Sequence, residues 1–182
     1  NSLIAVQGPN SRKTLESILN QNISNDFYTF IESSYKNSKI FISRTGYTGE
    51  LGFEIMASNE IIQFLWDEFI DMKVKPCGLA SRDILRIEMK YCLYGNDMDE
   101  TITPYESNLG WITSLNKGDF IGKDTIIKKK DTYKLVGFKM LERGIPRKGY
   151  EVLQDNKVIG KVTSGTQSPC LLYTSDAADD VI

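Results

Sequence analysis

The sequence predicts an α+β protein, and three features support this class. Residues 1 to about 125 mix short alternating strands with helices of three- and four-residue apolar periodicity. From Tyr133 the pattern changes to short strands separated by turns, as in KLVGFKM and YEVLQDNKVIGKVTSG. At 182 residues and 41% hydrophobic content, the chain is long enough to bury a core. We therefore expect an α+β domain followed by an antiparallel β domain.

The individual elements follow from apolar spacing and from Gly, Pro and Asn punctuation. Residues 21–37 show no clear period. In chain order we expect a strand at 3–6, a helix through Leu19 capped by Asn10 or Ser11, strands at 39–43 and 51–56, a helix from about Ile61 that is capped by Asn59 and ends near Val74 and Pro76, a helix at about 79–93, a short helix from about Gly122, a strand at 134–140, and a hairpin at 150–165 that turns at Asp155 and Asn156.

The strand at 51–56 follows a turn bracketed by Gly46 and Gly49. Within it Glu54 lies on the opposite face from Phe53 and Ile55, because successive strand residues alternate faces. Most strand glutamates simply face solvent. The functional alternative is that the carboxylate accepts paired hydrogen bonds from adjacent N–H groups of a flat heterocycle or a guanidinium. Spacing alone favours the solvent-facing interpretation.

The predicted helix at 79–93 has one apolar face and a stripe of three cations. Its apolar positions are Leu79, Ile84, Leu85, Ile87, Tyr91 and Cys92. Arg82, Arg86 and Lys90 recur at four-residue spacing, so they repel one another unless an anion faces them. One candidate anion is the following acidic loop, with Asp97, Asp99, Glu100 and Glu106; the other is a ligand carboxylate, which Arg binds through its planar fork. From spacing alone the structural network is the preferred interpretation.

Composition excludes several classes of function. A net charge of -2 gives no broad basic surface, so nucleic acid is not an expected partner. Histidine is absent, which removes His-dependent nucleophilic catalysis and imidazole metal sites, and we expect no metal. Three cysteines without a Cys-x-x-Cys pair suit a reducing compartment, and Cys77 and Cys92 are expected in the core. No run approaches the ~18 apolar residues of a membrane span.

Two long motifs carry a resemblance to a known family. The run SRTGYTGELGFEI at 43–55 and the run GLASRDILRIEMKYCLYGNDMDETITPYES at 78–107 resemble the folate-dependent aminomethyltransferase of the glycine cleavage system, its T-protein. The similarity extends from about Leu3 to about Pro169 and begins well inside the family's chain. CLLYTSDAADDVI, at 170–182, departs from the family pattern and resembles a translated adapter or vector sequence.

The resemblance implies the fold and domain arrangement. We expect residues 1–125 to be the C-terminal portion of the folate-binding aminomethyltransferase domain, 126–169 the start of an incomplete antiparallel β-barrel, and 170–182 a non-native tail. Without the family's further strands, the barrel would keep open edges. The tail should pack poorly, a prediction that buried contacts of Leu171 and Leu172 would contradict.

The resemblance also implies an activity: transfer of a methylene carbon from aminomethyl-lipoyl H-protein to tetrahydrofolate, with release of ammonia. Glu54 and Arg82 match the family's folate-binding glutamate and arginine, and Tyr47 and Arg86 are weaker matches for the pocket lining. We expect Glu54 and Arg82 to face one pocket. The family's catalytic aspartate is expected upstream of Asn1, so no catalytic residue is assigned and this chain alone is expected to be inactive.

The expected partners are tetrahydrofolate and the lipoyl-bearing H-protein, in the cytoplasm or, in a eukaryote, the mitochondrion. Two rival interpretations stay open at this point. One is a folate-binding relative without transferase activity, of the iron-sulfur assembly type. The other keeps the arginines and Glu54 as an ion-pair network in a structural domain.

Overall fold

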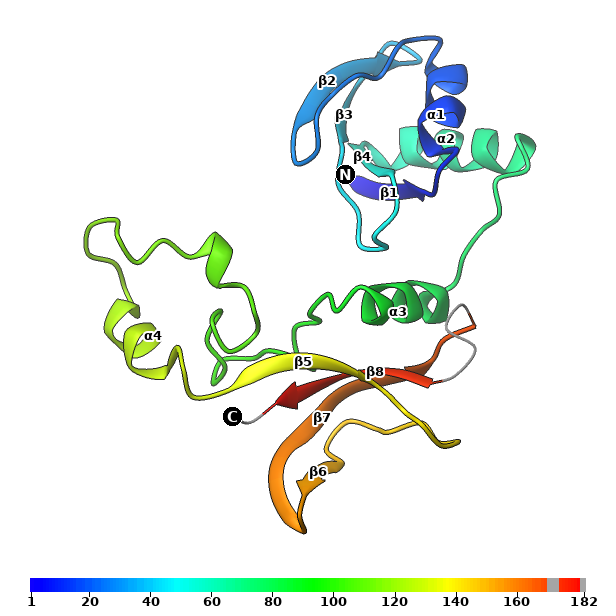
Figure 1. Ribbon diagram of the computed structural model, residues 1–182. Coiled ribbons are helices and arrows are strands. Elements are labelled where there is room, and N and C mark those ends of the chain that lie inside the picture. The colour runs from blue at the N-terminus through cyan, green and yellow to red at the C-terminus, as the bar shows by residue number, and fades with distance from the viewer. Residues whose placement is uncertain (170–173, 181–182) are drawn as a thin grey trace. The chain divides into compact units, whose positions relative to one another are not determined.

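Figure 1 shows the computed structural model, which describes residues 1–169 and 174–180. The chain divides into two compact units, Asn1–Arg82 and a second that begins at Asp83. Both combine helices with antiparallel strands, so the predicted α+β class is confirmed. Among the described residues, no helix combines the length and apolar character needed to cross a membrane.

The first unit is a four-stranded antiparallel sheet with two helices on one face. The strand order is β1-β4-β3-β2. In chain order the elements are β1 (Ser2–Gln7), α1 (Ser11–Leu19), β2 (Phe30–Tyr35), β3 (Ser38–Ser43), β4 (Gly52–Ala57) and α2 (Asn59–Asp71). The helices α1 and α2 lie against the sheet face that carries the core.

Apolar alternation builds this core, as the sequence predicts. Ile40 and Ile42 on β3, and Phe53 and Ile55 on β4, are fully buried. They pack with Leu15 and Leu65 of the two helices, among others. At roughly 1.5 to 3 kcal/mol for each fully buried large apolar side chain, this single layer supplies much of the unit's stability. The alternate strand positions face away from the helices.

Three expectations for the first unit need correction. Residues 30–35 form β2, although the sequence there shows no clear strand period; its pairing with β3 supplies the backbone hydrogen bonds that a weak pattern does not predict. The cap of α2 is Ser58, whose side chain accepts from Ile61 N, and Asn59 is the first helical residue. Cys77 is exposed.

Tyr35, in β2, makes the first unit sensitive to alkaline pH. Its hydroxyl donates to Glu68 Oε1 at 3.0 Å. Burial first, and then the hydrogen bond and charge of Glu68, raise the pKa of Tyr35 to about 12. Because the folded pKa exceeds the unfolded value, the stabilisation is complete below pH 10 and is lost as pH rises toward 12. We expect the stability advantage of wild type over Tyr35→Phe to shrink across this window in urea unfolding; a constant difference would contradict the assignment.

The second unit contains α3 (Leu79–Glu88, whose last six residues fall in this unit), a 3₁₀ turn at Gly110–Ile112, α4 (Lys123–Lys129) and a second antiparallel sheet. The sheet order is β5-β8-β7-β6. Its strands are β5 (Lys134–Lys139), β6 (Glu151–Gln154), β7 (Lys157–Gln167) and β8 (Thr174–Asp180). The predicted turn of the β6–β7 hairpin is confirmed, since Asp155 and Asn156 have φ of 51° and 63°, as a type I′ turn requires.

The helix α3 is shorter than predicted and its apolar face is less buried. It ends at Glu88 rather than near 93, because Lys90 adopts a left-handed φ of 57° and Tyr91 N turns back to donate to Arg86 O at 2.8 Å. Among the predicted apolar positions Ile87 is buried, whereas Leu79 is 85% exposed. The helix instead buries the guanidinium of Arg86.

Residues 83–125 belong to the same compact unit as β5. Within this unit Leu135 N, in β5, donates to Glu106 O at 2.9 Å. The domain boundary near residue 125 stays a prediction. Residues 174–180 pair with β5 and β7, although no strand was expected after Pro169; backbone ladders form without side-chain alternation. Leu171 and Leu172, on which the packing test of the tail was based, lie outside the described residues.

Candidate functional site

The loop at 44–51, between β3 and β4, carries part of the predicted site. Figure 1 shows it as the cyan segment that projects beyond the sheet. The strands on either side pair with Ile42 opposite Ile55 and Ser43 opposite Glu54. Since Ile42 and Ile55 are buried, this register places Glu54 on the opposite face, away from the helices.

Glu54 stands beside an apolar row on this outward face. Its lateral neighbours across the sheet are Ser43 and Ala5. The next row along the strands contains Phe41, Met56 and Leu3, paired in register. Leu3 and Met56 are exposed, so this row offers apolar surface next to a carboxylate. A flat, partly apolar ring with polar edges matches such a surface.

Thr45 orients the Glu54 carboxylate. Its hydroxyl donates to Glu54 Oε2 at 2.5 Å. This bond uses one of about four acceptor positions of the carboxylate and fixes its plane, because an ionised carboxylate accepts through both oxygens. Thr45 lies inside the SRTGYTGELGFEI motif, but nothing in the spacing of that motif predicts this contact.

Arg82 and Tyr47 are brought together in the first unit. The guanidinium carbon of Arg82 lies 4.7 Å from the centroid of the Tyr47 ring, within the range of a cation–π contact. Tyr47 belongs to the same loop as Thr45. The loop therefore contacts two further predicted residues: Thr45 contacts Glu54, and Tyr47 contacts Arg82. That Glu54 and Arg82 face one pocket stays a prediction.

Arg86, the fourth predicted residue, belongs to a buried network of hydrogen bonds and ion pairs in the second unit. Its Nη1 donates to Asp97 Oδ2 at 2.6 Å and to Tyr91 O at 3.2 Å. Its Nη2 donates to Ser164 Oγ at 2.8 Å, and its Nε to Asp83 Oδ1 at 2.8 Å. The side chain is 1% exposed. This geometry favours the ion-pair interpretation for Arg86.

Asp97 is the centre of that network. Its Oδ2 also accepts from Leu93 N at 2.9 Å, and its Oδ1 accepts from Thr163 Oγ1 at 2.5 Å and Ser164 Oγ at 2.8 Å. The acidic loop was one of the two candidate partners for the arginines, and its Asp97 pairs with Arg86. Asp99 instead accepts from Thr101, and this side-chain hydrogen bond is the main reason that its pKa is lowered.

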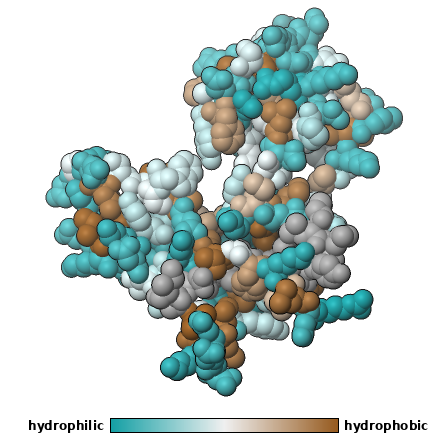
Figure 2. All heavy atoms as spheres, viewed as in Figure 1, coloured by the Kyte–Doolittle hydropathy of each residue, from teal (hydrophilic) through white to brown (hydrophobic). Residues whose placement is uncertain are grey.

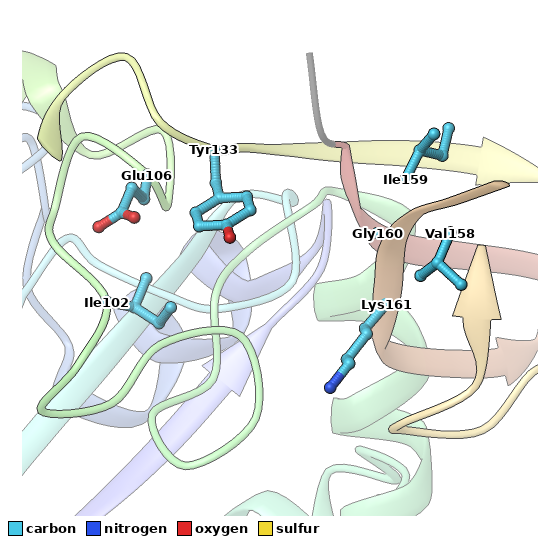
Figure 3. A pocket seen from close by; sticks show the side chains of 7 residues that line it. All are labelled: Ile102, Glu106, Tyr133, Val158, Ile159, Gly160 and Lys161. Carbon is cyan, nitrogen blue, oxygen red and sulfur yellow. The ribbon is translucent and has the colours of Figure 1, made fainter. Parts of the chain in front are cut away.

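The second unit also has an open groove of about 400 Å³. Figure 3 shows Ile102, Glu106 and Tyr133 on one side and Val158, Gly160 and Lys161 of β7 on the other. Glu106 Oε2 accepts from Thr103 N at 2.7 Å, so this carboxylate fixes the loop. None of the four predicted site residues lines the groove.

On the face seen in Figure 2 hydrophilic residues predominate, and hydrophobic residues show as separate patches. The outward sheet face contains predicted site residues, and the groove does not. The sheet face is therefore the candidate site.

Comparison with known protein families agrees with these features. The model of the GCVT N-terminal domain matches residues 1–117. The chain belongs to the glycine cleavage T-protein family. The model of the T-protein C-terminal barrel domain matches residues 134–174. The two matched segments contain the sheet of the first unit and the strands β5 to β7 of the second.

Curated relatives of this T-protein family chain are named aminomethyltransferases. The protein of Halothermothrix orenii is 47% identical over 178 residues, which cover 93% of this chain and 50% of the relative. The protein of Thermosipho melanesiensis is 48% identical over 175 residues, covering 93% and 48%. The chain thus spans about half the length of the curated relatives it matches.

A solved structure supports the fold. The crystal structure of the glycine cleavage system aminomethyltransferase T from Bartonella henselae superimposes with a TM-score of 0.88 at 30% sequence identity. The superposition covers 98% of this chain and 51% of the Bartonella chain. The α+β fold with a partial C-terminal barrel domain is therefore that of the family.

Proposed function

We propose that this chain carries the tetrahydrofolate site of an aminomethyltransferase of the glycine cleavage system. The observation that supports this most directly is the Glu54 carboxylate, oriented by Thr45 on the outward sheet face beside exposed apolar residues. A pterin presents adjacent N–H donors on a flat ring, and a carboxylate accepts them in pairs. The names of the curated relatives favour this transferase over a folate-binding relative without activity.

In the proposed reaction, a nitrogen of tetrahydrofolate attacks the aminomethyl carbon held on the lipoyl sulfur of the H-protein. The carbon–sulfur and carbon–amine bonds break as two carbon–nitrogen bonds to folate form. The products are methylenetetrahydrofolate, ammonia and the dihydrolipoyl group. In this chain Glu54 would hold the ring and Arg82, stacked on Tyr47, would contribute a fixed positive charge at the site.

We assign Arg86 a supporting part, because its donors are directed to Asp97, Ser164, Asp83 and Tyr91 O. The lipoyl-bearing H-protein is the proposed protein partner. The cytoplasm, or the mitochondrion in a eukaryote, is the proposed compartment, because three cysteines, an odd number without a Cys-x-x-Cys pair, suit a reducing environment better than a secreted disulfide framework.

Substitution of Arg82 tests the ligand role of the cation. Arg82→Lys keeps the charge but loses the planar fork and its stacking on Tyr47, so we expect tetrahydrofolate affinity to fall about three- to tenfold. Calorimetric titration of the 182-residue chain measures this affinity. Saturable binding by wild type is expected; if wild type does not bind, the proposed function is wrong.

Arg12→Lys is the matched control for that measurement. Arg12 also lies over an aromatic ring, 5.2 Å from the centroid of Phe53, but it belongs to α1, on the helical side of the sheet. Its replacement should leave folate affinity unchanged. An equal loss of affinity in both variants would mean that the effect is structural and not one of ligand contact.

A further inference from the structure

Gln7, the last residue of β1, ties the 44–51 loop to the sheet. Its Nε2 donates to Thr45 O at 3.3 Å and to Phe53 O at 3.1 Å. Its Oε1 accepts from Thr48 Oγ1 at 3.3 Å. One amide therefore contacts the beginning of the loop, its middle and the following strand.

The side-chain amide of Gln7 occupies space that is open because two neighbouring residues are glycines without a Cβ atom. An added Cβ at Gly46 would lie 2.0 Å from Gln7 Oε1, and one at Gly52 would also lie 2.0 Å from that atom. For both glycines the three nearest atoms all belong to the Gln7 side chain. Gly52 is also the cross-strand partner of Gln7. The glycines of the loop motif are thus fitted to a side chain about forty residues away.

The contacts of Gln7 lead directly to the candidate site. Thr45, whose carbonyl accepts from Gln7, uses its hydroxyl to orient Glu54. Thr48, which donates to Gln7, follows Tyr47 in the loop. We propose that Gln7 is a positioning residue for tetrahydrofolate binding: it fixes the loop that places Thr45 against Glu54 and Tyr47 against Arg82. This inference rests on the proposed function.

Two substitutions remove the same contacts in different ways. Gln7→Ala deletes the amide. Gly46→Ala should displace it, because the far end of a flexible side chain moves more readily than the backbone. The buried residues of the sheet are untouched, so both variants should unfold near the wild-type midpoint. Each should weaken tetrahydrofolate binding about five- to tenfold, the equivalent of one or two lost hydrogen bonds.

The double variant Gln7→Ala/Gly46→Ala separates positioning from simple damage. If both single changes act through the one amide, the double variant should bind no more weakly than either single variant. Gln63→Ala is the matched control, since Gln63 is an exposed glutamine of α2 that donates only to Asp67 Oδ1 among the interactions described. It should bind folate as wild type does. Additive losses in the double variant would contradict a shared mechanism.

Hydrogen exchange gives a readout that does not depend on ligand. In both single variants, backbone amides of residues 44–51 should exchange faster, while those of the β1–β4 ladder keep wild-type protection. Unchanged exchange at 44–51 together with wild-type folate affinity would overturn the inference. Failure of wild type itself to bind folate would instead overturn the proposed function, whatever the exchange measurement shows.

Discussion

Glu54→Gln is expected to weaken tetrahydrofolate binding about ten- to a hundredfold. The substitution keeps the shape of the side chain but replaces one acceptor oxygen with an N–H donor that opposes the ligand's own N–H groups. Hydrogen bonds to charged groups contribute about 1.5 to 3 kcal/mol, which corresponds to this range of affinity. The measurement is calorimetric titration of wild type and variant under identical conditions.

Stability should change little in Glu54→Gln, because Glu54 lies on the outward face and the buried residues on either side of it remain. The Thr45 hydroxyl can still donate to the amide oxygen. Glu32→Gln is the matched control: Glu32 lies on the same face, on β2, where it pairs with Lys39 at 2.7 Å and is 57% exposed. If stability falls in Glu54→Gln while wild type shows no folate binding, Glu54 belongs to a structural network instead.

Asp97→Ala is expected to destabilise the second unit by about 3 kcal/mol or more. Arg86 and Asp97 form a buried pair whose side chains are 1% and 0% exposed. Removing one partner of such a pair leaves an uncompensated buried charge and typically costs about 3 to 5 kcal/mol. The lower end applies because Asp83, which is 48% exposed, remains as a second partner of Arg86.

Unfolding of the second unit is followed through Trp111 fluorescence in a Trp66→Phe background, because the two tryptophans lie in different units. Asp99→Ala is the control, since Asp99 lies in the same loop and is exposed, and its carboxylate accepts hydrogen bonds from the nearby Thr101. It should unfold close to wild type. The double variant Arg86→Met/Asp97→Leu should recover much of the lost stability, as apolar replacements of buried pairs do. A stable Asp97→Ala variant would show that the network contributes little.

Local patterns were sufficient where the structural cause is itself local. Alternation in β4 predicts that Phe53 and Ile55 are buried and that Glu54 faces outward, since a strand's period of two assigns faces without reference to other segments. The Asp155–Asn156 turn was predicted for the same reason, because its left-handed backbone requirement falls on two adjacent residues. Glu54, Arg82 and Tyr47 as candidate ligands came instead from the long motifs shared with the T-protein family.

Long-range contacts decided what the patterns left open. Arg82 and Arg86 are equivalent in the four-residue stripe, yet Arg82 lies against Tyr47 while Arg86 is buried against Asp97 and Ser164, 11 and 78 residues away. Gln7 looks like an ordinary polar strand end, and its contacts lie 38 to 46 residues away. The sequence by itself determined the family, through its long motifs, and it determined most element types and the face of Glu54, because these depend on neighbouring residues. The strands β2 and β8 were not predicted, because they depend on pairing with other strands. Which polar groups become partners was decided only by the tertiary structure, because a buried donor or acceptor is satisfied by whatever the fold brings within hydrogen-bonding distance.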